Sequence, residues 1–389
     1  MYKKWYILLS RESMKIEIGD ILKSKAQTLV NTVNCVGIMG KGIALEFKNR
    51  FPDMFKDYLQ RCERKEIHLG VSYLYKSLFG PQIVNFPTKD HWKSVSKVSD
   101  IKKGLDYLVK NYRQWGITSI AIPPLGCGNG QLDWKTVGPL IYSVAKQMDI
   151  PVEIYAPYGT SPAELTISFL EKSGEPADYE RVAAKESRFP FNPAWLGLVE
   201  ILHRIENEPY HRPVGRTIFQ KIAYVATKEG LPTGFSYHRS SYGPFCKELK
   251  IAESKLINSN LIQEERGGRM FIMKTGSGFE EAKQRYKELL EKYTSVVEKT
   301  TDLFMRVDTT QAEVIATVLF VAFELKGSKK PFISEMDVLN EVKKWKQRRR
   351  PPLDEMSIAS TIRNLGMLGW LDIRPDEKLP VFDEDIVFV

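Results

Sequence analysis

The residues best suited to chemistry form a glycine-rich stretch between a β-branched run and a helix start. Glycines stand at positions 37, 40 and 42, and Asn31 and Asn34 precede them. Glycines let a ligand approach the backbone closely, and the start of a helix offers free N–H groups to an anion. The spacing fits neither the dinucleotide-binding G-x-G-x-x-G pattern nor a Gly-Lys-Ser/Thr phosphate loop. It predicts a phosphate or pyrophosphate cradle, with an ordinary tight turn as the alternative.

A second glycine-rich loop, at 125–130, follows the apolar run 119–124, which is typical of a central buried strand. A helix with its cap near Asp133 is predicted to follow this loop. In α/β sheets the ligand crevice lies at the carboxyl ends of the strands. Both loops are therefore expected to face one site, where the amides of Asn31 and Asn34 could bond sugar hydroxyls.

The elements that must position these loops are strands and helices in alternation over the first 158 residues. Apolar runs and alternation predict strands near 15–18, 30–34, 71–75, 82–87, 119–124 and 152–156. Helical spacing predicts helices from about 43, across 55–62 and 101–112, and from 133 to 148. The N-terminal part is thus predicted to be an α/β unit.

The second half is predicted to be mainly helical. The polar stretch after Lys172 suggests a linker, and Asn192-Pro193 a new beginning. We expect domains at 14–158, 192–300 and 301–389, with a linker at 159–191. Helices are predicted at 196–205, 217–227, 245–259, 280–299, 312–326, 336–346 and 358–368, and the segments after 259 and 368 resemble the hairpin endings of winged-helix modules.

Charge and composition narrow the classes of function. Residues 1–155 carry 23 Lys/Arg and 14 Asp/Glu, whereas residues 156–389 carry 34 of each, so all the excess positive charge lies in the first part. This favours an anionic partner for that part alone, with a merely basic surface as the alternative. No apolar run is long enough to span a membrane. The four cysteines show neither disulfide nor zinc spacing, so a reducing cytoplasm is expected.

Four motifs in order resemble the macrodomain family. They are Gly19-Asp20, the 34–42 loop, Phe86-Pro87-Thr88-Lys89, and Gly126-Cys127-Gly128 followed by Leu132-Asp133-Trp134. Within that family the sequence is most similar to the DarG-type antitoxins, which remove ADP-ribose from DNA modified by the toxin DarT. The likeness covers about residues 14–158. It implies a mixed sheet between helices and an ADP-ribose cleft.

The resemblance also implies roles for individual residues. Asp20 would hold the adenine amino group, the first glycine loop the distal ribose and diphosphate, and Tyr158 would stack on adenine. The second glycine loop would close over the diphosphate, and Lys89 matches the lysine on which the reaction depends. The substrate-binding residues implied are Asp20, Asn31, Asn34, Gly37, Ile38, Met39, Gly40, Lys41, Gly42, Thr88, Gly126, Cys127, Gly128, Asn129, Gly130 and Tyr158.

Two mechanisms are open to Lys89. An uncharged amine could attack the sugar carbon, which would require burial behind Trp92 and repulsion from Lys93 or Lys41 to lower the lysine pKa. Alternatively the lysine stays charged and stabilises the phosphates or the leaving group. A related human enzyme carries an aspartate that resolves its lysine adduct where this chain has Gly130. Asp90 and Asp133 are nearby, although Asp133 is more simply a helix cap.

Three functions follow from these features. The favoured one is an antitoxin that hydrolyses ADP-ribose from thymidine-linked single-stranded DNA, with the C-terminal region binding and neutralising DarT. A macrodomain that reads ADP-ribosylated DNA without cleaving it is the second, and a winged-helix transcription regulator the third. No cofactor, metal or membrane is implied, and ADP-ribose would be substrate or product.

Overall fold

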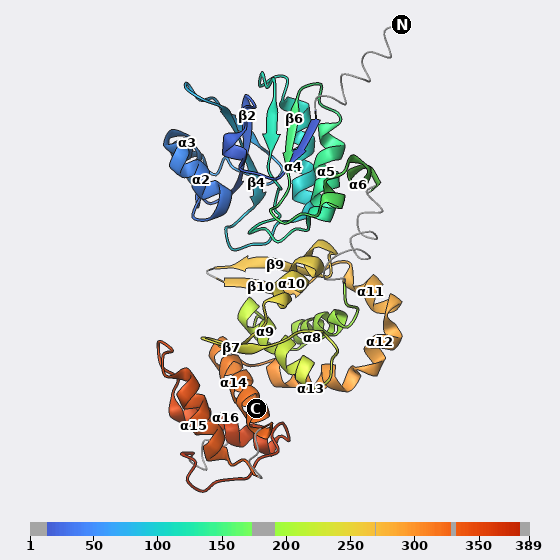
Figure 1. Ribbon diagram of the computed structural model, residues 1–389. Coiled ribbons are helices and arrows are strands. Elements are labelled where there is room, and N and C mark those ends of the chain that lie inside the picture. The colour runs from blue at the N-terminus through green and yellow to red at the C-terminus, as the bar shows by residue number, and fades with distance from the viewer. Residues whose placement is uncertain (1–13, 173–190, 269, 328–331, 382–389) are drawn as a thin grey trace. The chain divides into compact units, whose positions relative to one another are not determined.

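The computed structural model describes residues 14–172, 191–268, 270–327 and 332–381. The chain divides into two compact units, residues 1–191 and 192–389, which we call unit 1 and unit 2 (Figure 1). Residues 173–190 of the linker predicted at 159–191 lie outside the described residues. Each unit is considered by itself below.

Unit 1 is built on one six-stranded sheet with the order β1-β6-β5-β2-β4-β3. Its strands are β1 (Met14–Glu17), β2 (Thr28–Asn34), β3 (Tyr73–Tyr75), β4 (Gln82–Lys89), β5 (Ile120–Ile122) and β6 (Val152–Tyr155). The first five in this order run parallel, and β3 pairs antiparallel with β4 at the edge. The mixed sheet that the sequence predicted is confirmed.

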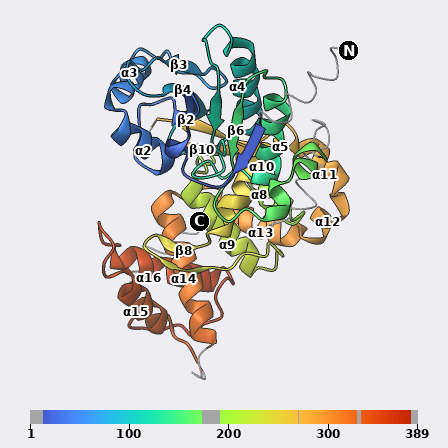
Figure 2. The ribbon, with the colours of Figure 1, turned by 45° about the horizontal axis from the view of Figure 1, so that its top comes forward.

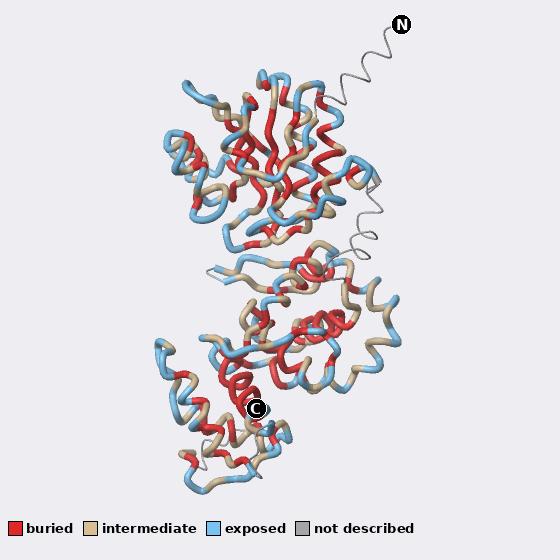
Figure 3. Tube along the Cα trace, in the orientation of Figure 1, coloured by how far each residue is buried: buried red, intermediate tan, exposed pale blue. Residues whose placement is uncertain are grey.

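Helices cover both faces of this sheet, as two views show (Figures 1 and 2). One face carries α2 (Gly42–Arg50) and α3 (Pro52–Glu63), and the other carries α4 (Val98–Asn111), α5 (Trp134–Ala145) and α6 (Ile167–Lys172). Each helix layer packs on its own hydrophobic cluster, around Phe47 and Tyr58 on the first face and around Leu105 and Ile141 on the second. The buried strands between these layers are drawn in red in Figure 3.

The end of unit 1 lies further along the chain than the predicted domain boundary at residue 158. The short 3-10 helix η2 (Pro162–Leu165) and α6 follow it, and Leu170 is buried in the cluster under α5. Residues 162–172, expected to be linker, therefore pack as part of unit 1. The apolar side chain of Leu170 explains the difference, because exposing it would lose the burial of a leucine.

Unit 2 is mainly helical, as predicted. It contains α8 (Trp195–Asn207), α9 (Arg216–Lys228), α10 (Glu248–Asn258), α11 (Phe279–Arg285), α12 (Lys287–Lys292), α13 (Thr294–Phe304), α14 (Thr309–Lys326), α15 (Glu335–Lys346) and α16 (Glu355–Met367). Its strands form two hairpins, β7 (His238–Ser240) with β8 (Gly243–Phe245), and β9 (Ile262–Gly267) with β10 (Met270–Thr275). The helix expected at 280–299 is divided into three.

The winged-helix expectation holds only in part. The hairpin predicted after residue 259 is present as β9 and β10. The second predicted hairpin is not formed within the described residues after 368, where Arg374 makes a single parallel bridge to Ser334. The division into two domains at residue 300 stays a prediction. Helix α14, which follows that residue and is largely buried (Figure 3), packs onto α9, which precedes it. In the described part of the chain, no helix is both long and apolar enough to cross a membrane.

Candidate functional site

The sequence-predicted residues lie at one edge of the unit 1 sheet. Asp20 follows β1, Tyr158 follows β6, the loop 126–130 follows β5 and the loop 37–42 follows β2. Lys89 is the last residue of β4. These five strands are parallel, so all five segments leave the sheet at its carboxyl edge. Asp20 and Lys89 are four strand spacings apart, about 19 Å at roughly 4.8 Å per spacing. This is the edge at which a ligand is expected to bind in an α/β sheet.

The first glycine loop is shaped from inside by Asn34. Its Oδ1 accepts from the backbone N–H groups of Val36 (3.0 Å) and Ile38 (3.3 Å), and its Nδ2 donates to Ile38 O at 2.5 Å. The Tyr58 hydroxyl donates to Asn34 O at 2.6 Å. Asn34 is buried, so its amide orders the loop rather than facing the solvent.

Asn31 and Met39 lie deeper than their predicted role suggested. Asn31 is fully buried within β2, and its Nδ2 donates to Asn85 Oδ1 on β4 at 2.8 Å. Met39 packs in the cluster around Phe47. Ile38, between the glycines, is exposed instead. The loop thus presents Ile38 and backbone groups outward, while Asn31 and Met39 support it from below.

The first loop ends in a helix N-terminus that no side chain caps. Lys41 is the N-cap residue of α2, and it makes no side-chain capping bond. Gly37 and Gly42 have φ values of +79° and +58°, which glycine adopts without strain. The first N–H groups of a helix have no intrahelical partner, and its dipole favours negative charge there. A cationic, uncapped N-terminus is suited to a phosphate.

The second glycine loop is packed tightly. A Cβ on Gly130 would lie 2.5 Å from Gly126 O and 2.9 Å from Gly126 Cα. A Cβ on Gly126, whose φ is +73°, would lie 2.8 Å from Leu132 Cδ1. Gly128 has no such neighbour within 4 Å. No side chain fits at Gly130 unless the loop backbone moves, which rules out a resolving carboxylate there in this conformation.

The helix after this second loop is already capped. Asp133 is the N-cap of α5, and its Oδ1 accepts from Lys135 N at 3.0 Å. The cap role predicted for Asp133 is thereby confirmed. The carboxylate occupies the positive end of the α5 dipole, so this junction is less suited to a phosphate than the first.

Lys89 connects the two loops. It is the last residue of β4, opposite Asn34 in β2, and its Nζ donates to Asn129 O (2.8 Å), Ser94 O (3.2 Å) and Trp92 O (3.4 Å). Three carbonyl acceptors match the three donors of an ammonium group. A neutral amine has only two N–H donors, so it would lose one of these bonds. Lys89 is only half-buried at the end of β4, short of the full burial that a neutral amine would require, and Trp92 is 47% exposed.

Neither cysteine of the glycine loops is suited to nucleophilic attack. Burial, and then the nearby Asp90 carboxylate, raise the pKa of the Cys35 thiol to about 12. Burial also raises the pKa of the Cys127 thiol well above its usual range. A reactive cysteine needs a lowered pKa. Cys127 packs against the core under α5, so only its backbone is available to a ligand.

The two residues expected to contact adenine, Asp20 and Tyr158, are exposed. Tyr158 is 77% exposed beyond β6. Asp20 caps the 3-10 helix η1 (Ile21–Lys23) by accepting from Leu22 N at 3.0 Å through Oδ1. Thr88 is buried, and its hydroxyl donates to Val33 O at 3.3 Å. Contacts of Asp20 and Tyr158 with adenine stay predictions, whereas Thr88 holds β4 against β2.

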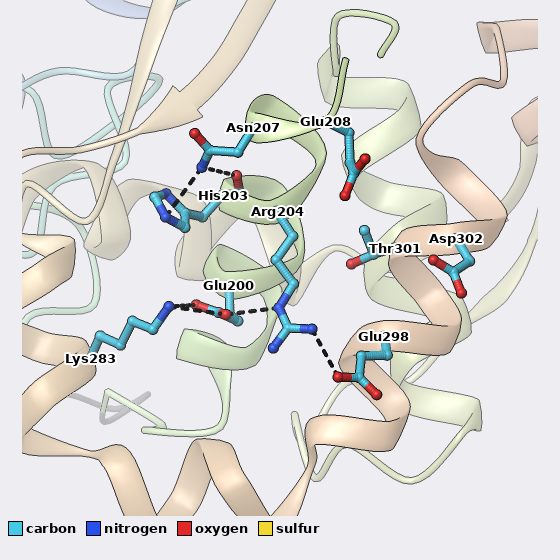
Figure 4. A pocket seen from close by; sticks show the side chains of 9 residues that line it. All are labelled: Glu200, His203, Arg204, Asn207, Glu208, Lys283, Glu298, Thr301 and Asp302. Atoms are coloured by element: carbon cyan, nitrogen blue, oxygen red, sulfur yellow. Dashed lines mark hydrogen bonds and ion pairs between the residues drawn. The ribbon is translucent and has the colours of Figure 1, made fainter. Parts of the chain in front are cut away.

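A separate hollow lies in unit 2 between α8, α11 and α13 (Figure 4). At its base, Glu200 is paired with Lys283 at 2.8 Å and Arg204 at 2.9 Å, and Arg204 also contacts Glu298 at 3.3 Å. Burial opposes the charge of Glu200, but hydrogen bonds from Lys283 and Arg204 hold its pKa below the usual value. The central charges neutralise one another, so this hollow is less suited to catalysis than the carboxyl edge of the sheet.

Comparison with known proteins finds relatives of this chain. Residues 30–141 match the Macro domain family. The chain is 36% identical over 238 residues to the DNA ADP-ribosyl glycohydrolase of Mycobacterium tuberculosis, which covers 60% of this chain and 64% of that one. It is 39% identical over 164 residues to a DNA ADP-ribosyl transferase-DNA ADP-ribosyl glycohydrolase fusion protein of Thermosipho africanus, covering 38% of this chain and 42% of that one.

Solved structures similar to this chain include a macrodomain. The macrodomain of Mycobacterium tuberculosis DarG shows 46% identity and a TM-score of 0.36, covering 37% of this chain and 97% of that one. The chain thus spans about 64% of the length of the Mycobacterium glycohydrolase.

Proposed function

We propose that this chain, whose residues 30–141 belong to the macro domain family, hydrolyses the bond between ADP-ribose and DNA. The observation that carries the proposal is the position of Lys89, whose Nζ contacts the second glycine loop while its backbone pairs with the strand that enters the first. The likeness to DNA ADP-ribosyl glycohydrolases supports the choice of DNA as the modified molecule. The modified base is taken to be thymine, in single-stranded DNA.

We infer that ADP-ribose lies along the carboxyl edge, and the charges and exposed residues of this edge support the inference. The diphosphate lies at the uncapped N-terminus of α2, beside Lys41. The adenine lies toward Asp20 and the exposed Tyr158 ring, and the distal ribose lies toward Lys89. The sugar carbon bonded to the base is then close to the Lys89 ammonium.

Lys89 acts as an ammonium group in this proposal. As the bond from the sugar carbon to the thymine nitrogen breaks, negative charge develops on the base. One N–H group of Lys89 turns from its carbonyl acceptor to the base, stabilises this charge and donates its proton. Water adds to the sugar carbon and loses a proton to solvent, and Lys89 regains its proton from water. The three carbonyl acceptors of Nζ support this role over nucleophilic attack. The lack of space for a resolving carboxylate at Gly130 supports it too.

The test uses single-stranded thymidine-containing DNA modified by a DarT-type toxin. Wild-type protein should release free ADP-ribose, and Lys89→Ala should lose at least a hundredfold in rate while still retaining the modified DNA. A protein that retains modified DNA but releases nothing, with or without Lys89, is a reader. The feature that favours this second candidate is glycine at position 130, where the related human enzyme carries its aspartate.

Unit 2 is proposed to bind the toxin DarT. Residues 156–389 carry equal numbers of basic and acidic residues, and a mixed-charge surface suits a protein partner better than a duplex. A relative in which transferase and glycohydrolase are fused supports a link between the two activities. Hydrogen exchange of the full chain, with and without DarT, should show new protection in 192–381. Protection confined to 14–172 would contradict this assignment.

A further inference from the structure

The turn that holds the Lys89 ammonium also displays an aromatic pair. Ser94 N donates to His91 O at 2.9 Å, which closes the turn, and the carbonyls of Trp92 and Ser94 accept from Lys89 Nζ. The rings of His91 and Trp92 are stacked, with centroids 5.6 Å apart and planes 30° apart. An aromatic surface therefore stands beside the amine on which hydrolysis depends.

Packing does not account for the presence of Trp92. Its side chain is 47% exposed, and it belongs to neither hydrophobic cluster of unit 1. Tryptophan is a large apolar residue that is usually well buried in a folded protein. An exposed ring next to a binding site is a candidate for contact with a ligand, because nothing in the core of unit 1 requires it.

The charge around the ring indicates an anionic, aromatic ligand. Lys93 Nζ lies 5.0 Å from the centre of the Trp92 ring, and both Lys93 and Lys41 are exposed. Residues 1–155 hold the whole net positive charge of the chain. Aromatic rings for bases, together with cations for the backbone, are the means by which proteins hold single-stranded nucleic acid.

We propose that Trp92, assisted by Lys93, is a stacking platform for the nucleotide next to the modified thymidine of single-stranded DNA. The inference rests on the proposed function, because it assumes that the sugar carbon lies at Lys89. The base of the neighbouring nucleotide stacks on Trp92, and its phosphate lies near Lys93. In a duplex the same base is already stacked and paired, so the platform selects single strands.

The test compares full-length wild type, Trp92→Ala, Trp92→Phe and Phe79→Ala on two substrates. One is a modified single-stranded oligonucleotide, and the other is ADP-ribosylated thymidine without flanking nucleotides. Trp92→Ala should lower kcat/KM for the oligonucleotide by roughly 5- to 150-fold and leave the nucleoside within twofold. Trp92→Phe should restore most of the loss. Phe79, 91% exposed on the β3–β4 turn at the opposite edge of the sheet, is the matched control and should have no effect.

An equal loss on both substrates would overturn the proposal, because Trp92 would then act only on the Lys89 turn. No loss on either would overturn it as well. Affinity for unmodified oligonucleotide, measured by fluorescence anisotropy, provides a readout that needs no hydrolysis. It should fall by a similar factor in Trp92→Ala, and an unchanged affinity would contradict the platform. If the proposed function fails instead, wild type releases ADP-ribose from neither substrate.

Discussion

The two loops of unit 1 are both rich in glycine, but they differ in how the helix after each of them begins. The first leads into α2 with Lys41 at an uncapped N-terminus, and the second leads into α5, which Asp133 caps. A carboxylate already neutralises the second helix dipole, whereas the first is left for a ligand. The comparison predicts that the residue at the start of the following helix decides whether a glycine loop can bind a phosphate.

The loops also differ in what holds them. The first is held by the side chains of Asn34 and Tyr58, through hydrogen bonds to its backbone. The second is held by backbone hydrogen bonds, such as those from Leu132 N to Gly126 O and from Ser96 N to Gly130 O, and by close packing of Gly130 on Gly126. Removing an amide side chain should therefore destabilise the first loop, and adding a side chain should destabilise the second.

The largest effect is expected from Gly130→Ala. The new Cβ would meet the backbone of Gly126, so the second loop must rearrange at a cost of about 3 kcal/mol in the free energy of unfolding. Urea denaturation followed by tryptophan fluorescence measures it. Gly128→Ala is the matched control, because no atom lies within 4 Å of that Cβ. Equal stability of the two variants would show that the second loop is not held by packing.

A smaller effect is expected from Asn34→Ala. It leaves the N–H groups of Val36 and Ile38 without their acceptor, at a cost of about 2 kcal/mol, and ADP-ribose should bind more weakly because the loop loses its order. Calorimetric titration with ADP-ribose and urea denaturation measure the two effects. Asn111→Ala, which removes an amide bond to Tyr107 O on α4, should leave the affinity unchanged. Unchanged affinity in Asn34→Ala would contradict the account of the first loop.

The smallest effect is expected from Lys41→Asp, which makes the first loop resemble the second. The carboxylate would cap α2 and repel the diphosphate, so affinity for ADP-ribose should fall about tenfold, or roughly 1.4 kcal/mol, with stability retained. Calorimetric titration measures the change. Lys41→Gln should lose less, and Asp133→Asn should leave the affinity unchanged. Equal affinity of Lys41→Asp and wild type would place the diphosphate elsewhere.

The sequence predicts the strands and the shared edge of unit 1 because both depend on local patterns. Alternating and continuous apolar runs locate the six strands, and parallel strands bring their carboxyl ends together. No local pattern in the sequence shows how deeply an individual residue of the site is buried. Asn31 bonds to Asn85, which lies 54 residues away, and Asn34 turns into its own loop. The space around Gly130 is limited by Gly126 and Ser96, which come close to it only in the folded loop.

In unit 2, tertiary structure overrides local pattern in two places. The segment predicted as one helix at 280–299 is interrupted at Tyr286 and Tyr293, whose backbones leave the helical region although no glycine or proline stands there. The second predicted wing lacks a paired strand in the described residues, and Arg374 bridges to Ser334 instead. Helix propensity and apolar spacing carry no information on either event.

The most direct test of the central claim is a search for a covalent intermediate on Lys89. Wild-type protein is mixed with modified single-stranded DNA and cyanoborohydride, and its intact mass is followed through one turnover. An ammonium that protonates the leaving base predicts release of ADP-ribose with no added mass on the protein. A reduced ADP-ribose adduct on Lys89, absent from Lys89→Ala, would contradict the account and establish the lysine as a nucleophile.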